Sequence, residues 1–379
     1  MVKVNIIIPF TYLDNYYYHR YYDQFKAYAD NFENVTILVE SGVENFENTI
    51  PNLSINFMQI RKSDYVMTLK QKIVYFIKKV TLINYVRRWS EIPIIVEYWR
   101  DKPFCYNADA LISYSGTGWQ QYMHCKLGES LGIPVIYRMR GNGVKEREQG
   151  SLPNRLASNY LHNKSLELYD YHIPISQEYY RLLLEWGISP RRISDPLTIG
   201  VNTMLFTRKW YPKKLTFGFI GNLTKIKNID FLIEVMNANP DLNFMVVGKK
   251  IHKFKFPSNC KVYKAVPKDN VPYMFNYMNM LLHPSLSEGT SNVILESYST
   301  NTPVLGTENA FGDLKVFGFS SEPDVHEWSI ILNGISEESL SYLGMDAREY
   351  AATFEWKGFG KSMRKIVDGV IKDEYGMER

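Results

Sequence analysis

Short apolar runs that alternate with helix-like stretches constrain the fold of this chain most strongly. Residues 2–9 form a largely apolar run, residues 16–30 have the pattern of a helix, and residues 35–40 form a second largely apolar run. A strand that is apolar at successive positions is expected where helices cover both faces of a parallel sheet. The same alternation returns after residue 215. We therefore predict an α/β chain built from strand–helix–strand units.

The length and composition indicate two globular domains. A chain of 379 residues is longer than one hydrophobic core usually supports, and 45% of its residues are apolar. The formal net charge of +4 gives no indication of nucleic-acid binding. Three cysteines without metal-ligand spacing suggest a reducing compartment, and we expect a cytoplasmic protein. We expect no signal peptide and no membrane span, because no apolar run is long enough.

Residues 283–305 carry the pattern that points most directly to chemistry. A turn of small polar residues, 287–292, leads into an apolar run that we interpret as the start of a helix. Free N–H groups at a helix N-terminus attract anions, and Gly289 allows a ligand to approach the backbone. Three neighbouring residues add side-chain donors: Thr290, Ser291 and Asn292. Glu296, further along the helix, can accept from a sugar hydroxyl. Phosphate donors beside such a carboxylate suggest a nucleotide-sugar site.

Glu288 and Glu296 stand in this stretch with seven residues between them. That spacing alone is common on solvated helix faces, so its weight comes from the surrounding residues. These are Pro284-Ser285, Glu288-Gly289, Val293-Ile294-Leu295-Glu296 and Pro303-Val304. Together they resemble the donor-site signature of family 4 glycosyltransferases of the GT-B type, and further matches extend over most of the chain.

The resemblance implies two Rossmann-like domains that face each other across a cleft, the GT-B arrangement. Residues 1–206 would bind the acceptor, residues 207–355 would bind the nucleotide sugar, and residues 356–379 would form a helix that crosses back. The implied activity is that of a retaining glycosyltransferase with a UDP- or GDP-linked donor and no essential metal or other cofactor. The implied acceptor is a hydroxyl group, for example on a lipid-linked or surface glycan. Glu288 would contact the donor sugar and Glu296 the ribose.

The loop after residues 215–220 departs from the family pattern at one position. It keeps Gly221 and Lys227 but has Asn222 where the family usually has arginine. By resemblance, Lys227 would stabilise the departing diphosphate together with the helix start at Gly289 to Asn292. An amide binds phosphate less well than a bidentate guanidinium, and one charged hydrogen bond contributes about 1.5–3 kcal/mol. We expect weaker donor binding unless Lys225 or Arg140 compensates.

The acceptor side is predicted from residues that follow two strands of the first domain. Gly116, Gly118, Arg140 and Asn142 fall where parallel strands end, on the expected rim of a binding site. The segment 108–142 resembles the family's N-domain pattern, in which a histidine commonly stands at the position of Arg140. We expect Gly116, Arg140 and Asn142 to bind the acceptor, and Arg140 to act at the catalytic site with Glu288 and Lys227. An arginine can clamp a phosphate or carboxylate, which suggests an acidic acceptor; an ordinary surface arginine is the alternative.

Residues 68–89 have a helical apolar period, six lysine or arginine residues and no acid. Such a basic amphipathic helix can lie on an anionic membrane surface, which would place the protein on the inner face of a membrane. A core-facing helix with a solvated basic face is the alternative.

Two other functional classes stay open. One is a nucleotide-sugar epimerase or phosphorylase on the same two-domain plan, which would need no sugar acceptor. The other is a non-catalytic nucleotide-sugar-binding protein, suggested by Asn222 and by the missing histidine. The first loop lacks the glycines of a dinucleotide-binding fingerprint, which argues against a nicotinamide-dependent dehydrogenase.

Overall fold

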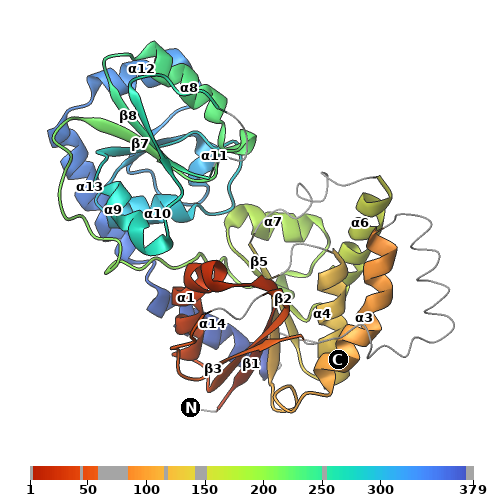
Figure 1. Cartoon of the computed structure of the whole chain (residues 1–379). Coiled ribbons are helices and arrows are strands. Elements are labelled where there is room, and N and C mark those ends of the chain that lie inside the picture. The colour runs from red at the N-terminus through yellow and green to blue at the C-terminus, as the bar shows by residue number, and fades with distance from the viewer. Residues whose placement is uncertain are drawn as a thin grey trace. The chain divides into compact units, whose positions relative to one another are not determined.

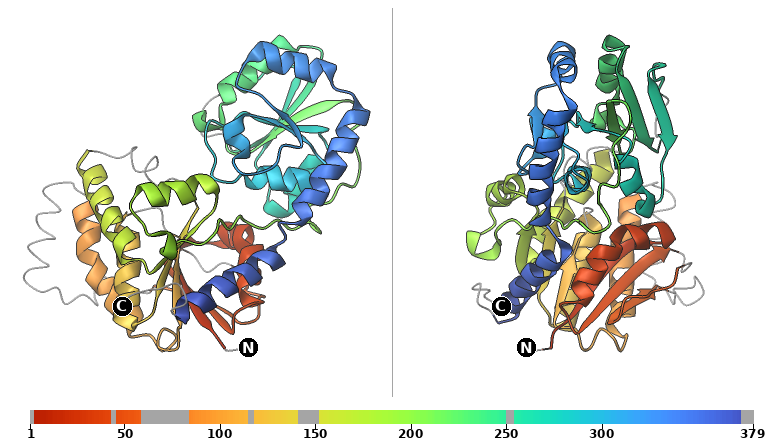
Figure 2. Two further views of the ribbon diagram at one scale, coloured as in Figure 1. Left: turned by 180° about the vertical axis from the view of Figure 1, so that it is seen from behind. Right: turned by 90° about the vertical axis from the view of Figure 1, so that its left-hand side faces the viewer.

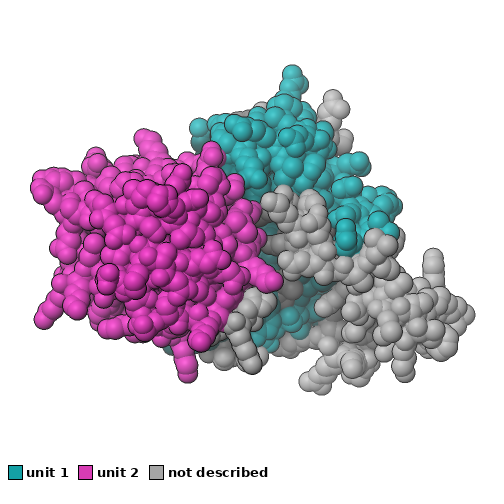
Figure 3. All heavy atoms as spheres, turned by 90° about the horizontal axis from the view of Figure 1, so that it is seen from above, with its two compact units in different colours: residues 1–197, 360–379 teal, residues 198–359 magenta. Residues whose placement is uncertain are grey.

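The computed structural model describes residues 3–42, 46–58, 84–114, 118–140, 152–249 and 254–372. The chain forms two compact units, residues 1–197 with 360–379 and residues 198–359 (Figure 3). Each unit holds a six-stranded parallel sheet covered by helices (Figure 1). The predicted α/β fold with two Rossmann-like domains is therefore confirmed.

The sheet of the first unit has the strand order β3-β2-β1-β4-β5-β6. Its strands are β1 (Asn5–Leu13), β2 (Asn34–Gly42), β3 (Leu53–Phe57), β4 (Ala110–Ser113), β5 (Val135–Met139) and β6 (Tyr171–Pro174). Each neighbouring pair is parallel. Every residue of β4 and β5 is buried, as expected for central strands with helices on both faces.

Helices lie on both faces of this first sheet (Figure 2). They are α1 (Asn15–Ala29), α3 (Asn84–Arg100), α4 (Gly118–Leu131), α6 (Leu152–Leu168), α7 (Gln177–Glu185) and the later part of α14 (Trp356–Ile371). α1 begins where the Asp14 side chain accepts from Tyr17 N, a normal N-cap. Arg364 of α14 donates to Asn31 O at 2.8 Å, which ties this part of α14 to the first unit.

The second sheet has the order β12-β11-β10-β7-β8-β9, so both sheets follow the doubly wound plan. Its strands are β7 (Thr216–Ile220), β8 (Asn243–Gly248), β9 (Cys260–Lys264), β10 (Met280–His283), β11 (Val304–Gly306) and β12 (Gly318–Ser320). Its α-helices are α8 (Ile229–Ala238), α9 (Val271–Phe275), α10 (Asn292–Ser299), α11 (Glu308–Phe311), α12 (Val325–Gly334) and α13 (Glu337–Ala352). Phe231 and the fully buried Trp328 meet edge to face at 5.1 Å, and α8 thereby packs against α12.

The second unit begins at Thr198, earlier than the boundary that we placed after residue 206. Val201 pairs with Glu355 in a parallel bridge, and Thr203 Oγ1 donates to Glu355 Oε1 at 2.6 Å. Residues 198–206 therefore pack with the second unit. The basic segment 68–89 falls outside the described residues as far as residue 83, and its last residues begin α3. Within the described parts of the chain, no helix is long and apolar enough to cross a membrane.

Candidate functional site

The loops after β7 and β10 meet at the centre of the second sheet. In doubly wound sheets, ligands bind at the carboxyl ends of the two neighbouring strands where the strand order reverses. These strands are β7 and β10, which pair directly with each other. The loop after β7 leads to the short 3₁₀ helix η3 (Lys225–Lys227), and the loop after β10 leads to Glu288 and α10.

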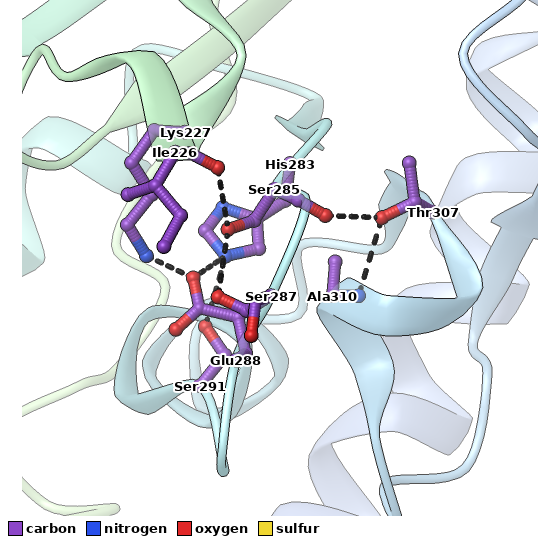
Figure 4. Close-up of polar contacts among 9 residues, drawn as sticks. All are labelled: Ile226, Lys227, His283, Ser285, Ser287, Glu288, Ser291, Thr307 and Ala310. Carbon is purple, nitrogen blue, oxygen red and sulfur yellow. Dashed lines mark hydrogen bonds and ion pairs between the residues drawn. The ribbon is translucent and has the colours of Figure 1, made fainter. Parts of the chain in front are cut away.

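Lys227 and Glu288 form an ion pair across these two loops (Figure 4). η3 ends at Asn228, which adopts a left-handed backbone at φ 52°, a conformation that asparagine tolerates. The Lys227 and Glu288 side chains are only 22% and 15% exposed. The pair is therefore held in a partly dehydrated position rather than on an open surface.

His283, the last residue of β10, contacts the same carboxylate. Its Nε2 lies 3.1 Å from Glu288 Oε1 and 3.1 Å from Ser291 Oγ (Figure 4). Burial by itself would raise the pKa of Glu288, but the His283 hydrogen bond and the Lys227 charge outweigh it and hold this pKa at about 2. Glu288 is therefore ionised at neutral pH.

The ionised carboxylate determines the tautomer of His283. A carboxylate only accepts hydrogen bonds, so His283 Nε2 carries the proton and donates it to Glu288. Nδ1 is then unprotonated, and this buried atom has no hydrogen-bond partner among the described residues. Burial lowers the pKa of His283, which keeps the ring neutral. Ser291 Oγ faces the same N–H as an acceptor, so its own hydroxyl hydrogen stays available for a ligand.

Further hydrogen bonds hold three loops of the site together. Leu286 N donates to Ile226 O at 2.9 Å, which joins the loop after β10 to the loop after β7. Thr307 Oγ1 donates to Ser285 O at 2.6 Å, which joins the loop after β11 to the loop after β10 (Figure 4). These bonds fix the backbone just before Glu288.

The predicted donor-binding residues 289–292 and Glu296 lie at the start of α10. Ser291 is the N-cap, but its side chain makes no capping hydrogen bond because it faces His283. The N–H groups of the first helical turn lack intrahelical partners, and the helix dipole favours an anion there. Gly289 and Thr290 are half-buried, Asn292 is exposed, and Glu296 is half-buried one turn further along α10.

Gly221 and Asn222 lie directly after β7. Gly221 has φ 156°, and a Cβ on Gly248 would stand 1.8 Å from Gly221 O, so the end of β8 approaches this loop closely. Leu223 N donates to Lys249 O at 3.0 Å and holds the loop in place. Asn222 itself is exposed, at the position where the family resemblance predicted an arginine.

In the first unit, Arg140 follows β5. Its guanidinium carbon lies 5.4 Å from the centre of the Tyr21 ring and 5.6 Å from that of Tyr114, within cation–π range of both. No carboxylate in the described part of the chain forms an ion pair with it. The other two predicted acceptor residues, Gly116 and Asn142, lie outside the described residues.

Gly118 serves packing, which corrects our expectation that it lines the rim of a site. It is buried at the start of α4, and a Cβ there would stand 2.1 Å from Ser158 O of α6. The absence of a side chain lets α4 and α6 approach each other.

Sequence reasoning missed four contacts around these positions. We assigned no catalytic role to His283 from the sequence, yet this residue contacts both Glu288 and Ser291. A polar residue at the carboxyl end of an apolar strand was the available signal. Tyr21 and Tyr114 beside Arg140 gave no comparable signal. The described residues contain no group of three or more His, Cys, Asp or Glu side chains that could hold a metal ion.

Comparison with known proteins shows similarity to glycosyltransferases. Residues 202–318 match the model described as glycosyl transferases group 1. An uncharacterized glycosyltransferase of Methanocaldococcus jannaschii is 24% identical over 259 residues, which cover 64% of this chain and 70% of that protein. An uncharacterized glycosyltransferase of Sulfolobus islandicus rod-shaped virus 1 is 30% identical over 112 residues, 26% of this chain and 32% of that protein.

Solved structures show the same fold over nearly the whole chain. Sucrose-phosphate synthase from Thermosynechococcus elongatus has a TM-score of 0.71 at 15% identity, covering 98% of this chain and 100% of that one. HepE of Anabaena in complex with UDP-glucose has a TM-score of 0.70 at 13% identity, covering 96% and 99%. The family match over residues 202–318, the glycosyltransferase relatives and the shared two-domain fold together support a GT-B glycosyltransferase of the glycosyl transferases group 1 family.

Proposed function

We propose that this glycosyltransferase moves a sugar from a UDP- or GDP-linked donor to a hydroxyl acceptor, with retention of the anomeric configuration and without an essential metal. The observation that supports donor binding most directly is the Lys227–Glu288 pair beside the N-terminus of α10. HepE of Anabaena has been solved with UDP-glucose and with UDP, which makes uridine nucleotides the first donors to test.

In this proposal the donor diphosphate binds at the start of α10. The N–H groups of the first turn and the Ser291 hydroxyl would donate to its oxygens. Lys227 carries three N–H donors, so it can keep its contact with Glu288 and also reach a phosphate. Such donors, already in place before the reaction, would stabilise the negative charge that develops on the departing diphosphate.

Glu288 is suited to bind the donor sugar. Both of its contacts, from Lys227 and His283, involve Oε1, and Oε2 has no partner among the described residues. An ionised carboxylate with one free oxygen can accept from a sugar hydroxyl. We propose that Oε2 makes this contact and that Glu296, further along α10, accepts from the ribose.

For the acceptor, we propose the first unit and Arg140 as a binding residue, with Gly116 and Asn142. The guanidinium carries its charge without an ion-pair partner among the described residues and lies against two tyrosine rings. This environment suits an acceptor with a phosphate or carboxylate group. Weaker turnover of Arg140→Ala with acidic acceptors, compared with Arg140→Lys, is the expected result. Equal rates in both variants and the parent would remove Arg140 from the proposal.

The acceptor class would also explain the basic segment 68–89. A lipid-linked acceptor requires the enzyme to work at a membrane, and a basic amphipathic helix can bind an anionic surface. We therefore propose a cytoplasmic enzyme that associates peripherally with the inner face of a membrane. Vesicle binding that persists after neutralising the six basic residues of this segment would contradict this role for it.

Donor binding is tested by thermal unfolding with a panel of UDP- and GDP-linked sugars in the presence of EDTA. The parent is compared with Lys227→Ala, Glu296→Ala and the control Lys357→Ala, an exposed lysine at the start of α14. A ligand at ~100 times its dissociation constant adds about 2.7 kcal/mol of stability. We expect one sugar nucleotide to stabilise the parent and the control but neither site variant. Stabilisation by none of them would contradict the donor site.

Product analysis with the donor found in this way distinguishes a glycosyltransferase from an epimerase, a phosphorylase or a non-catalytic binding protein. A glycosyltransferase releases the nucleoside diphosphate faster when acceptor is added, and NMR of the new linkage reports retention or inversion. A changed sugar nucleotide without acceptor would indicate an epimerase, and a requirement for inorganic phosphate would indicate a phosphorylase. Binding without any turnover would favour the non-catalytic function suggested by Asn222.

A further inference from the structure

The second unit carries an aromatic and basic surface that the donor site does not use. We define the aromatic–basic patch by two groups of residues. Its rings are Trp210, Tyr211, Tyr273 and Tyr277, and its cations are Arg208, Lys209, Lys213 and Lys214. They come from the segment that leads into β7 and from α9 with the residues that follow it.

Three rings of the patch, Trp210, Tyr273 and Tyr277, lie in contact through Trp210, and all four rings remain open to solvent. Trp210 lies 6.3 Å from Tyr273 and 5.7 Å from Tyr277 between ring centres. The four rings are 39–49% exposed. Large aromatic side chains clustered at the surface, rather than scattered singly, usually mark an interaction site.

The backbone beneath the rings is fixed by buried groups. Asn276 is almost fully buried, and its Oδ1 accepts from Lys209 N at 2.6 Å and from Trp210 N at 3.2 Å. Arg208 Nη1 donates to Phe275 O at 2.9 Å and to Met278 O at 3.0 Å. These bonds hold residues 208–210 against the end of α9, so the backbone that carries the Trp210 ring has a fixed position.

The charge of the patch is positive and uncompensated. Residues 196–229 contain no aspartate or glutamate. Lys209, Lys213 and Lys214 are exposed, and none of them has an ion pair with a described residue. Arg208 bonds to carbonyl and hydroxyl oxygens and lies over the Tyr211 ring. No described carboxylate forms an ion pair with any of these four side chains.

The patch lies at the amino ends of the central strands β7 and β10, whereas the proposed donor site lies at their carboxyl ends. Lys214 lies two residues before β7 and Tyr277 three residues before β10, and Thr216 N donates to Asn279 Oδ1 where both strands begin. Lys227 and Glu288 follow the other ends of these same strands. A surface bound to the patch would therefore leave the donor loops uncovered.

We infer that the aromatic–basic patch docks the second unit on an anionic lipid bilayer. Tryptophan and tyrosine combine an apolar ring with a polar edge, which suits the headgroup region of a bilayer. Lysine side chains reach lipid phosphates, and an anionic leaflet attracts each by about 1 kcal/mol, or about fivefold in affinity. This surface is separate from the basic segment 68–89 and does not depend on the identity of donor or acceptor.

Vesicle co-sedimentation of the full chain tests the inference. Vesicles of phosphatidylcholine alone are compared with vesicles containing phosphatidylglycerol, at low and high salt. One variant neutralises three patch lysines: Lys209→Gln, Lys213→Gln and Lys214→Gln. Its matched control neutralises three exposed lysines elsewhere in the unit: Lys261→Gln, Lys264→Gln and Lys357→Gln. We expect binding to anionic vesicles to fall on the order of 100-fold in the first variant and less than threefold in the control.

The contribution of the rings is tested in the same assay. Trp210→Ala with Tyr277→Ala should weaken binding at high salt, where screening leaves mainly the apolar contribution. Tyr342→Ala, at an exposed ring on α13, is the control. Thermal unfolding confirms that each variant is folded. Three results would overturn the inference: no vesicle binding by the parent, binding abolished only by changes in segment 68–89, or loss of a dimer instead of vesicle binding in the ring variant.

Discussion

Replacing His283 by leucine tests how the Glu288 carboxylate is held. The change removes the N–H that faces Glu288 and Ser291, whereas His283→Gln keeps an amide N–H of similar reach. A hydrogen bond to a charged group contributes about 1.5–3 kcal/mol. Water can replace little of this contribution, because Glu288 is only 15% exposed. We expect His283→Leu to lower the free energy of unfolding of the second unit by about 2 kcal/mol at pH 7, and His283→Gln to lose less than half of that.

The pH dependence of this loss tests the neutral tautomer. Burial lowers the pKa of His283 in the folded state. The contribution of His283 to the free energy of unfolding is therefore complete above the unfolded-state pKa near 6.5 and declines as the pH falls below it. The parent therefore loses stability between pH 7 and pH 5, while the leucine variant lacks this loss. The difference between them should narrow on acidification. A protonated His283 paired with Glu288 would make the difference widen instead.

Hydrogen exchange in urea, followed by mass spectrometry on peptides from β7 and β10, reports the unfolding free energy of the second unit. The same proteins are assayed for donor turnover, where His283→Gln should recover most of the kcat/KM that His283→Leu loses. Equal destabilisation by leucine and glutamine, or a difference that grows below pH 6.5, would refute the assignment of His283 as a neutral donor to Glu288.

Three further predictions follow from single positions. Burial lowers the pKa of His172 to about 3, so the contribution of this residue to the unfolding free energy should fall by about 2 kcal/mol between pH 6.5 and pH 5. Denaturant titrations of His172→Phe should lack this pH-dependent loss. Gly248→Ala should cost about 1–3 kcal/mol and weaken donor binding in calorimetry, because its Cβ would stand 1.8 Å from Gly221 O; Gly334→Ala, with no atom within 4 Å, is the control and should leave binding unchanged. Asn222→Arg should tighten binding of the donor nucleotide by about 10- to 100-fold if the added guanidinium reaches the diphosphate, and unchanged affinity would place residue 222 away from the phosphates.

The sequence predicted the strands that position the site because these strands are buried on both faces. The apolar runs at 215–220 and 280–283 correspond to β7 and β10 within one residue at each end. β12 was not predicted, because its three residues are partly exposed and give no apolar run. The signal therefore came from burial, and it was weakest at the edge of the sheet.

The site itself was only partly predictable. Lys227 and Glu288 lie 61 positions apart, and their contact depends on the parallel pairing of β7 with β10. Their roles were suggested by resemblance to a family, since no spacing rule connects them. The role of His283 needed atomic positions, because the direction of one N–H bond distinguishes a packed ring from a donor to Glu288.

The charge balance around Glu288 bears on how the proposed donor site would bind a diphosphate with Asn222 in place of the arginine that the resemblance predicts. Glu288 neutralises Lys227, His283 is neutral and Asn222 carries no charge, so these four side chains contribute no net positive charge. In the proposed site, the remaining attraction for a diphosphate would come from the N–H groups at the start of α10, the Ser291 hydroxyl and Lys225 of η3. Directional N–H and O–H donors bind an anion only in the geometry they are fixed for, and in a partly buried site they are screened less by salt than exposed charges are. In the proposed donor site, the hydrogen bonds that tie the loops after β7, β10 and β11 together would therefore matter as much as the N–H and O–H donors themselves, because they determine where those donors point.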